Sequence, residues 1–218
     1  MVVHANRSDM TLVVFDLGRV LVRICDDWQH ACRCAGVALP REMDAAQLPR
    51  LRQYVLDQEV GKLAFATFAR EAAPLMGLAP EEIRAFSEAY IRGPYPGSVE
   101  LVEELSAAGV ATACLSNTND HHWEMLSKPG HAAFFPLEKL THRFASHLVG
   151  SRKPDEAIYA HVERATGLPP RAMLFFDDVP DNVEAARKRG WNAQRIDPVP
   201  DDPIGQMRQV LQQRGIIL

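Results

Sequence analysis

The chain has 218 residues, of which 47 % are apolar and 24 % are charged, and its formal net charge is −4. This composition is typical of a globular domain with a sizeable core, and the slight negative charge gives no reason to expect a nucleic acid or an anionic membrane as a partner. Apolar runs fall short of the roughly 18 residues that span a membrane. The run after Met10 is broken by Asp16 and Arg19, which makes it a poor signal-peptide core, so we expect a cytoplasmic protein.

Short runs rich in β-branched and aromatic residues alternate with helical patterns along the chain. We predict strands at residues 11–15, 111–115, 143–147, 172–176 and 192–196, the third being the weakest. Strands that alternate with helices form parallel sheets covered on both faces. The sequence therefore predicts an α/β fold with a Rossmann-like, doubly wound parallel sheet.

Three helices between these strands have recognisable ends. The first starts at Ser98 and stops before Gly109, a residue suited to a helix C-terminus. The second has Pro154 at its first position, followed by acidic residues that favour the helix dipole. The third starts at Pro180 and becomes basic before Gly190.

Residues 24–92 follow a different pattern. They show helical periodicity and no good strand, and the glycines and prolines of residues 93–97 then mark the return to the α/β pattern. We interpret this region as a helical insert after the first strand. The predicted organisation is a core of residues 1–23 and 93–218 with a cap of residues 24–92 over the active end of the sheet.

The cysteines do not form a recognisable framework. They are Cys25, Cys32, Cys34 and Cys114, and His30 lies close to the Cys-x-Cys pair. This spacing matches no standard zinc pattern, and Cys32 and Cys34 would point to different faces of a helix. We expect ordinary reduced cysteines here, in preference to a metal site.

Polar side chains follow several of the predicted strands. Asp16, Ser116 and Asp177 each come directly after a strand, Asp178 follows Asp177, and Lys153 precedes a predicted helix. In open parallel sheets, ligands bind at the carboxyl ends of the strands. We therefore expect these five residues to share one site.

Four segments, "FDLGRVLV", "LSNTN", "RKPDEAIY" and "FFDDVPDN", occur in this order and together resemble the haloacid dehalogenase superfamily. Within it they are most similar to bacterial sugar-phosphate phosphatases of the glucose-1-phosphate phosphatase type and to the amino-terminal phosphatase domain of soluble epoxide hydrolase. Each segment alone is a weak signal, whereas all four in order are specific. The resemblance implies a Mg²⁺-dependent phosphatase that hydrolyses a small phosphorylated metabolite, such as a sugar phosphate, through an aspartyl-phosphate.

The resemblance also implies a role for each motif residue. Asp16 would attack phosphorus and, with Asp178 and the backbone carbonyl of Gly18, would hold Mg²⁺. Lys153 would neutralise the nucleophile and the phosphoryl group, and Asp177 would orient Lys153 or hold a metal-bound water. The remaining two positions would donate hydrogen bonds to phosphate oxygens: Ser116 and Asn117.

One position departs from the wider superfamily. Most of its phosphatases carry a second aspartate two residues after the nucleophile as a general acid, a role worth about 10²–10⁴-fold in rate, and here that position is Gly18. The leaving group of an acyl or anomeric phosphate would need little help. Otherwise another residue would donate the proton, and the candidates are His121, His122, Asp26 and Asp27.

The glycine also keeps two other functions open. A 2-haloacid dehalogenase lacks the second aspartate too, although the late acidic pair favours a metal-dependent phosphatase. A protein that binds phosphorylated metabolites without turnover is the second possibility. Glu59 and Gly61 resemble a turn of the family's cap that approaches the substrate, although an ordinary helix end would fit them equally well. Neither the orientation of Arg19 nor the oligomeric state follows from the sequence.

Overall fold

The computed structural model describes residues 12–38, 45–197, 199 and 201–217. Parts of three predictions lie outside these ranges, namely Thr11 of the first strand, residues 39–44 of the cap, and residues 1–11, 198, 200 and 218 of the core. Every helix in the described part of the chain is too short or too polar to cross a membrane.

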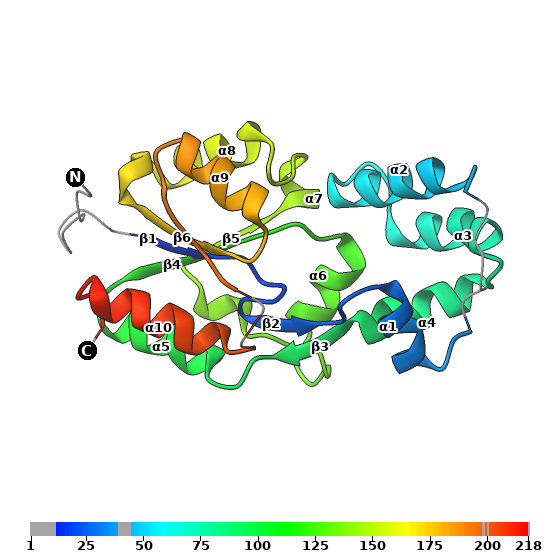
Figure 1. The fold of residues 1–218 in the computed structure, drawn as a ribbon, viewed down its shortest axis with the longest axis horizontal. Coiled ribbons are helices and arrows are strands. Elements are labelled where there is room, and N and C mark those ends of the chain that lie inside the picture. Colours follow the sequence, from blue (N-terminus) through cyan, green and yellow to red (C-terminus); the bar gives the residue numbers. More distant parts are fainter. Residues whose placement is uncertain (1–11, 39–44, 198, 200, 218) are drawn as a thin grey trace.

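A parallel sheet forms the centre of the molecule (Figure 1). Among the described residues it has five strands in the order β5-β4-β1-β6-β7, so the first strand lies in the middle and the chain winds outward on both sides of it. The predicted doubly wound α/β sheet is confirmed. The strands are β1 (Leu12–Phe15), β4 (Ala111–Ser116), β5 (His142–Ala145), β6 (Met173–Asp177) and β7 (Asn192–Arg195).

Side chains of the central strand alternate between two apolar layers, as the period of two in a strand requires. Val13 and Phe15 pack towards α5 and α10, whereas Leu12 and Val14 pack towards α8 and α9. Because both layers are apolar, β1 is buried along its whole length. The covering helices are α5 (Ser98–Ala107), α8 (Glu156–Thr166), α9 (Pro180–Lys188) and α10 (Pro203–Gln213).

Two predicted boundaries were wrong by two residues, whereas those of β4, β6 and β7 differ from the prediction by at most one residue. The third strand ends at Ala145, because Ser146 begins a short helix, α7 (Ser146–Val149). The helix predicted to start at Pro154 starts instead at Glu156, because residues 152–155 form a turn closed by a hydrogen bond from Asp155 N to Arg152 O. The other short elements of the core are α6 (Asp120–Ser127), η1 (Leu137–Lys139) and η2 (Pro170–Ala172).

The ends of the insert pair with each other in an antiparallel ribbon of β2 (Val22–Ile24) and β3 (Ile91–Pro94). The prediction of no strand within residues 24–92 was therefore wrong at both ends. The two strands have only three and four residues, and they contain Arg23, Gly93 and Pro94. They are therefore too short and too irregular to show the alternation of apolar and polar residues from which strands are predicted.

Between the two ribbon strands, the described residues form four helices that pack round apolar side chains of their own, at one end of the sheet (Figure 1). We call them the cap helices. They are α1 (Trp28–Ala35), α2 (Leu48–Glu59), α3 (Phe65–Met76) and α4 (Pro80–Tyr90). The ribbon joins them to the core beside α6, so these helices lie over the carboxyl ends of the sheet strands.

Candidate active site

Three neighbouring strands bring the predicted site residues to one edge of the sheet. In the register of the sheet, Phe15 lies between Cys114 of β4 and Phe176 of β6. Asp16 extends β1 by one residue, and its backbone N–H donates to Phe176 O at 2.8 Å. Ser116 and Asp177 are the last residues of β4 and β6, so they and Asp16 meet at the carboxyl edge of the sheet.

Lys153 lies at the centre of the group. Its Nζ is 2.8 Å from Asp16 Oδ1 and 2.7 Å from Asp177 Oδ2, and only 1 % of the side chain is exposed. Asn117 holds the backbone of this residue from both sides, because Asn117 Nδ2 donates to Lys153 O and Lys153 N donates to Asn117 Oδ1, both at 2.8 Å. We expected the Asn117 amide to donate to phosphate, but it holds Lys153 instead.

Asp177 is fully buried, and its carboxylate accepts several hydrogen bonds. Besides Lys153 Nζ, the donors are Val179 N at 2.8 Å and Asn182 Nδ2 at 3.0 and 3.1 Å. With its oxygens engaged in this way, Asp177 is suited to orient Lys153 and poorly suited to bind a cation directly. Asn182, on the first turn of α9, was not identified from the sequence.

The donor set at this edge fits a magnesium ion. Asp16, Asp177 and Asp178 each offer a carboxylate oxygen, and these oxygens lie within 4.8 Å of one another. The Gly18 carbonyl accepts no backbone hydrogen bond from the described residues and is free to serve as a further ligand. Hard oxygen donors of this kind are the ligands that Mg²⁺ prefers. With Asp177 engaged by Lys153, the direct ligands would be Asp16, Asp178 and the Gly18 carbonyl.

The charges of the cluster do not balance. Burial, together with the neighbouring carboxylates, raises the pKa of Asp16 to about 7 in spite of Lys153, and burial beside Asp177 also raises the pKa of Asp178. Burial alone would lower the pKa of Lys153, but Asp16 and Asp177 raise it above its usual value, so the lysine stays charged. Two cations, Lys153 and the partly exposed Arg19 beside Asp178, thus face three carboxylates, and a divalent ion would relieve the remaining negative charge.

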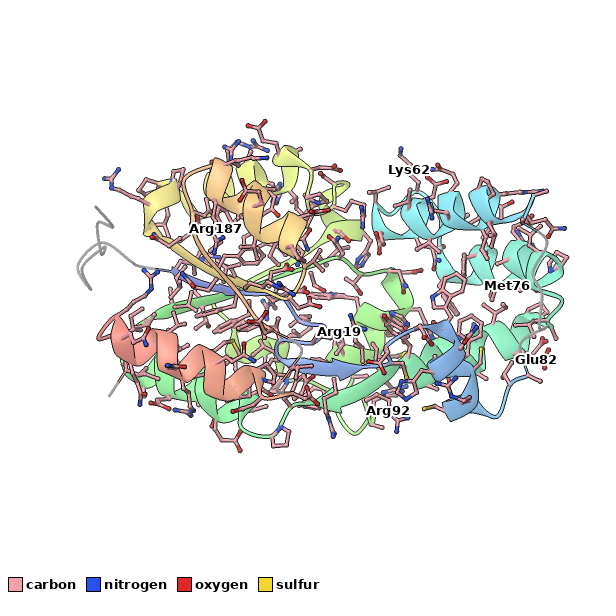
Figure 2. The ribbon with its side chains drawn as sticks, viewed as in Figure 1. Arg19, Lys62, Met76, Glu82, Arg92 and Arg187 are labelled. Carbon is pink, nitrogen blue, oxygen red and sulfur yellow. The ribbon has the colours of Figure 1, made fainter. Side chains whose placement is uncertain are left out.

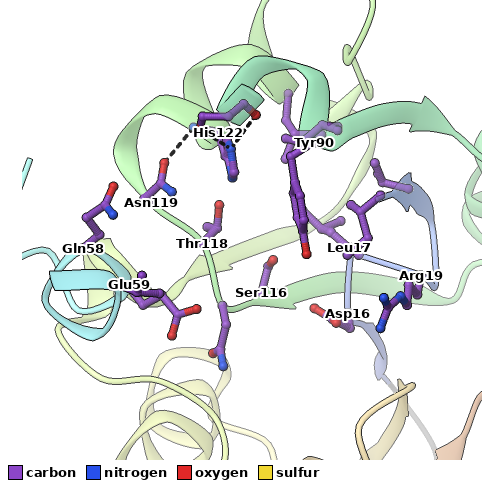
Figure 3. Close-up of a pocket in the computed structure, with 18 of the residues that line it drawn as sticks. Asp16, Leu17, Arg19, Gln58, Glu59, Tyr90, Ser116, Thr118, Asn119 and His122 are labelled. Atoms are coloured by element: carbon purple, nitrogen blue, oxygen red, sulfur yellow. Dashed lines mark hydrogen bonds between the residues drawn. The ribbon is translucent and has the colours of Figure 1, made fainter. Parts of the chain in front are cut away.

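A pocket of about 340 Å³ separates these residues from the cap helices. Ser116, which is buried, lines its floor beside Asp16 (Figure 3). Much of the wall is apolar, and Gln58 is a polar exception whose Oε1 is buried without a hydrogen-bond partner among the described residues. The apolar lining includes Ile24, Trp28, Val55, Phe65, Phe68 and Phe86.

Arg19 lies between the sheet edge and the cap (Figure 2). It has a positive φ of 58°, and its Nη1 is 3.7 Å from Asp178 Oδ2, so it faces the site, a point that the sequence left open. Glu59 also lines the pocket, where it forms an ion pair with Arg152. Gly61, two residues later, lies directly against the backbone of His147 in the core.

None of the four predicted proton donors is placed to protonate a leaving group beside Asp16. Asp27 caps α1 through His30 N, and the side chain of Asp26 is 79 % exposed. His122 lines the pocket, but its Nε2 is held by Ser87 Oγ and Ser87 O, and burial lowers its pKa to about 4. The remaining candidate, His121, stacks on Phe65.

Tyr90, which no sequence motif marks, lines the same pocket. Its ring stacks on His122, and its hydroxyl points down the pocket towards the end that holds Asp16 and Ser116 (Figure 3). Among the described residues this hydroxyl has no hydrogen-bond partner. Burial raises the pKa of Tyr90, so the hydroxyl keeps its proton. No signal in the sequence separates this tyrosine from an ordinary helix-end residue.

A family model for haloacid dehalogenase-like hydrolases matches residues 12–190. The chain belongs to this family. Its five parallel strands and flanking helices also match solved members of the family, which establishes the fold of this hydrolase independently of the motifs.

Three similar proteins illustrate the match. A phosphatase from Mycobacterium tuberculosis, MT3486, is 32 % identical over 117 residues, which is 54 % of this chain and 52 % of that protein, so the chain spans about half the length of this relative. A predicted HAD-like hydrolase from Porphyromonas gingivalis is 21 % identical, with a TM-score of 0.75 over 94 % of this chain and 98 % of that one. A HAD family enzyme from Bacteroides thetaiotaomicron, in complex with magnesium and inorganic phosphate, is 21 % identical, with a TM-score of 0.70 over 85 % and 93 %.

Proposed function

We propose that this hydrolase is a Mg²⁺-dependent phosphatase that acts on a small phosphorylated metabolite through an aspartyl-phosphate on Asp16. The observation that carries the proposal is the pair of contacts from Lys153 Nζ to Asp16 and Asp177, beside the carboxylate of Asp178. A magnesium ion held by Asp16, Asp178 and the Gly18 carbonyl would neutralise the cluster and polarise the phosphoryl group. The phosphatase name of the mycobacterial relative and the magnesium and phosphate bound by the Bacteroides enzyme support the same reading.

In this mechanism Asp16 supplies the nucleophile. One carboxylate oxygen of Asp16 attacks phosphorus, the bond from phosphorus to the leaving oxygen breaks with its electron pair going to that oxygen, and the leaving oxygen then takes a proton from solvent water. Water then attacks the same phosphorus, which releases inorganic phosphate and restores the carboxylate. Throughout, Lys153 compensates the negative charge on the phosphoryl oxygens, and the Ser116 hydroxyl donates to one of them.

Tyr90 is the side chain best placed to assist the leaving group in the absence of an acid at position 18. Its protonated hydroxyl points to the reacting end of the pocket from the cap side, opposite the sheet edge that carries Asp16. A hydrogen bond from this hydroxyl would stabilise the charge that develops on the leaving oxygen. A side chain at position 18 would have to compete for space with Ile24, whose Cδ1 lies 3.1 Å from the position of a Cβ atom there.

The wall of the pocket restricts the substrate. Residues 24–92, which we propose as the cap, contribute mainly aliphatic and aromatic side chains, which would leave most sugar hydroxyls without partners. The unpartnered Gln58 Oε1 calls for a single hydrogen-bond donor on the substrate. This favours a phosphate ester with an apolar body and one hydroxyl or amino group over a bare sugar phosphate.

Hydrolysis of p-nitrophenyl phosphate tests the proposal. We expect turnover that requires Mg²⁺, is abolished by a chelator, and falls at least 10³-fold in Asp16→Asn, because the nucleophile is lost. Undiminished turnover in Asp16→Asn would refute the assignment.

Two other outcomes would replace the proposal, and both stem from the glycine at position 18. Halide release from 2-chloropropionate in the presence of a chelator would make the protein a dehalogenase. Binding of phosphate esters without turnover, over aryl and acyl phosphates alike, would make it a binding protein.

A further inference from the structure

A second group of metal-ligating side chains lies outside the carboxylate site. Cys25, His30 and Cys34 each offer a ligand atom, and these three atoms lie within 4.8 Å of one another. His30 and Cys34 are four residues apart on α1 and therefore share one face of the helix. Cys32 lies two residues before Cys34 on α1 and therefore on a different face of the helix, and it is not one of the three grouped ligands.

The three side chains are presented by two well-defined pieces of backbone. Asp27 fixes the start of α1, since its carboxylate accepts from His30 N at 2.6 Å. Cys25 directly follows β2; its backbone N–H donates to Tyr90 O at 2.8 Å, and its Sγ donates to Ala89 O at 3.5 Å. The ligand atoms thus join the first cap helix to the strand that leaves the core.

We propose that Cys25, His30 and Cys34 bind one borderline-soft divalent cation of the zinc type. Two sulfur atoms and one imidazole form a typical zinc donor set, whereas Mg²⁺ prefers oxygen. In a tetrahedral site the ligand atoms would be about 3.5–3.8 Å apart, so little closure is needed from the observed spacing. A water molecule would fill the fourth coordination position of the cation, because Cys34 lies at the surface.

A carboxylate next to the histidine supports this assignment. Asp26 Oδ2 lies 3.2 Å and the Asp26 backbone N lies 3.3 Å from His30 Nδ1, which leaves Nε2 as the ring nitrogen for a cation. Metal-binding histidines commonly pair their second ring nitrogen with a carboxylate, which fixes the orientation of the ring. The site is independent of the proposed phosphatase activity, because none of its three ligands belongs to the carboxylate cluster.

Titration of the reduced, chelator-treated full chain with Co²⁺ in excess Mg²⁺ tests the proposal. A sulfur-to-cobalt charge-transfer band should saturate at one equivalent of Co²⁺ and disappear when Zn²⁺ is added. Oxygen ligands give no such band, so Co²⁺ bound at Asp16 and Asp178 would not imitate it. We expect Cys34→Ser and His30→Gln to weaken Co²⁺ binding at least tenfold.

Cys32→Ala provides the matched control, since it removes a thiol from the same helix but from the opposite face, and Cys114→Ala removes a thiol from the core. Both should bind Co²⁺ as the unaltered chain does. The proposal is overturned if one equivalent of Co²⁺ gives no charge-transfer band, or if Cys34→Ser and His30→Gln bind as tightly as the unaltered chain. It is also overturned if mass spectrometry shows that Cys25 and Cys34 form a disulfide that persists in reducing buffer.

Discussion

At the scale of single residues, the site depends on how Lys153 is held. A buried lysine is costly unless its charge is paired, and here Asp16 and Asp177 both pair with it while Asn117 fixes its backbone. Asp177 is in turn fixed by Asn182. Of the two carboxylates that pair with Lys153, only Asp16 therefore has a second oxygen that can face a substrate.

The raised pKa of Asp16 predicts a pH-dependent stability of the metal-free protein. Because the folded state holds this proton up to a pH of about 7, whereas the unfolded chain releases it near pH 4, the contribution of Asp16 to stability is full below pH 4 and is lost as the pH rises to 7. The Asp16→Asn variant has no carboxyl group at this position, so its stability lacks this dependence on pH. In a chelator, the Tm of the unaltered chain should therefore fall relative to Asp16→Asn as the pH rises from 4 to 7, by roughly 2–4 °C for each kcal/mol. Parallel Tm curves measured by calorimetry would contradict this.

Tyr90→Phe tests the role of the hydroxyl in departure of the leaving group. The alkoxide of an alkyl phosphate is a poor leaving group. Turnover of an alkyl phosphate should therefore fall about 10- to 100-fold in Tyr90→Phe, which corresponds to the loss of one hydrogen bond to a developing charge. Hydrolysis of p-nitrophenyl phosphate, which has a good leaving group, should change much less. Steady-state kinetics with both substrates would count against the role if the two losses were equal.

Sequence patterns predicted which residues meet at the site. They did not predict which contact each side chain makes there. Asp16, Ser116, Lys153, Asp177 and Asp178 could be located because each stands at a motif position or after a strand. The side-chain bonds of Asn117 depend on the path of a loop 36 residues away. Tyr90 and Gln58 depend on how the cap helices pack, which no local pattern encodes.

At the scale of elements, the end of α2 meets the core at a point where only glycine fits. Gly61 has a φ of +72°, and a Cβ atom there would lie 2.2 Å from the carbonyl oxygen of His147 in α7. The ion pair of Glu59 with Arg152 lies beside this contact. The two contacts hold the cap helices close to the sheet edge, and so define the depth of the pocket.

Gly61→Ala should therefore displace α2 from the core and raise KM for aryl phosphates about tenfold. Gly36→Ala is the matched control, because Gly36 has a similar φ of +68° but no atom within 4 Å of its Cβ position. Both substitutions should cost about 1–2 kcal/mol of stability through the left-handed backbone. Equal KM values for the two variants, in an assay of initial rates, would rule out a specific contact at Gly61.

Elements with strong periodicity could be predicted, and irregular ones could not. β1, β4 and β6 are buried runs of four to six residues, and Gly109 and Gly190 mark helix ends as expected. The ribbon of β2 and β3 was missed, because strand pairing between residues some 70 positions apart leaves no trace in a local window. The group formed by Cys25, His30 and Cys34 was also missed, because Cys25 follows β2 whereas the other two lie on α1, and helix geometry alone does not bring them together.

At the scale of the whole molecule, we expect Mg²⁺ binding at the carboxylate cluster to be coupled to folding. A ligand that binds only the folded state stabilises it by about 2.7 kcal/mol at a concentration of 100 Kd. Mg²⁺ should therefore raise the Tm of the unaltered chain. The increase should vanish in Asp178→Asn and persist in Asp181→Asn, which alters an exposed acid on the first turn of α9. An unchanged increase in Asp178→Asn would exclude that carboxylate as a ligand.

The central claim is that Asp16 carries the phosphoryl group during turnover. Acid quench of the reaction with p-nitrophenyl phosphate and Mg²⁺ within the first turnover, followed by peptide mass spectrometry, measures this directly. The account predicts a phosphoryl adduct on the peptide that contains Asp16 and none in Asp16→Asn. Release of inorganic phosphate at full rate with no adduct at any time point, or an adduct on a different residue, would contradict it.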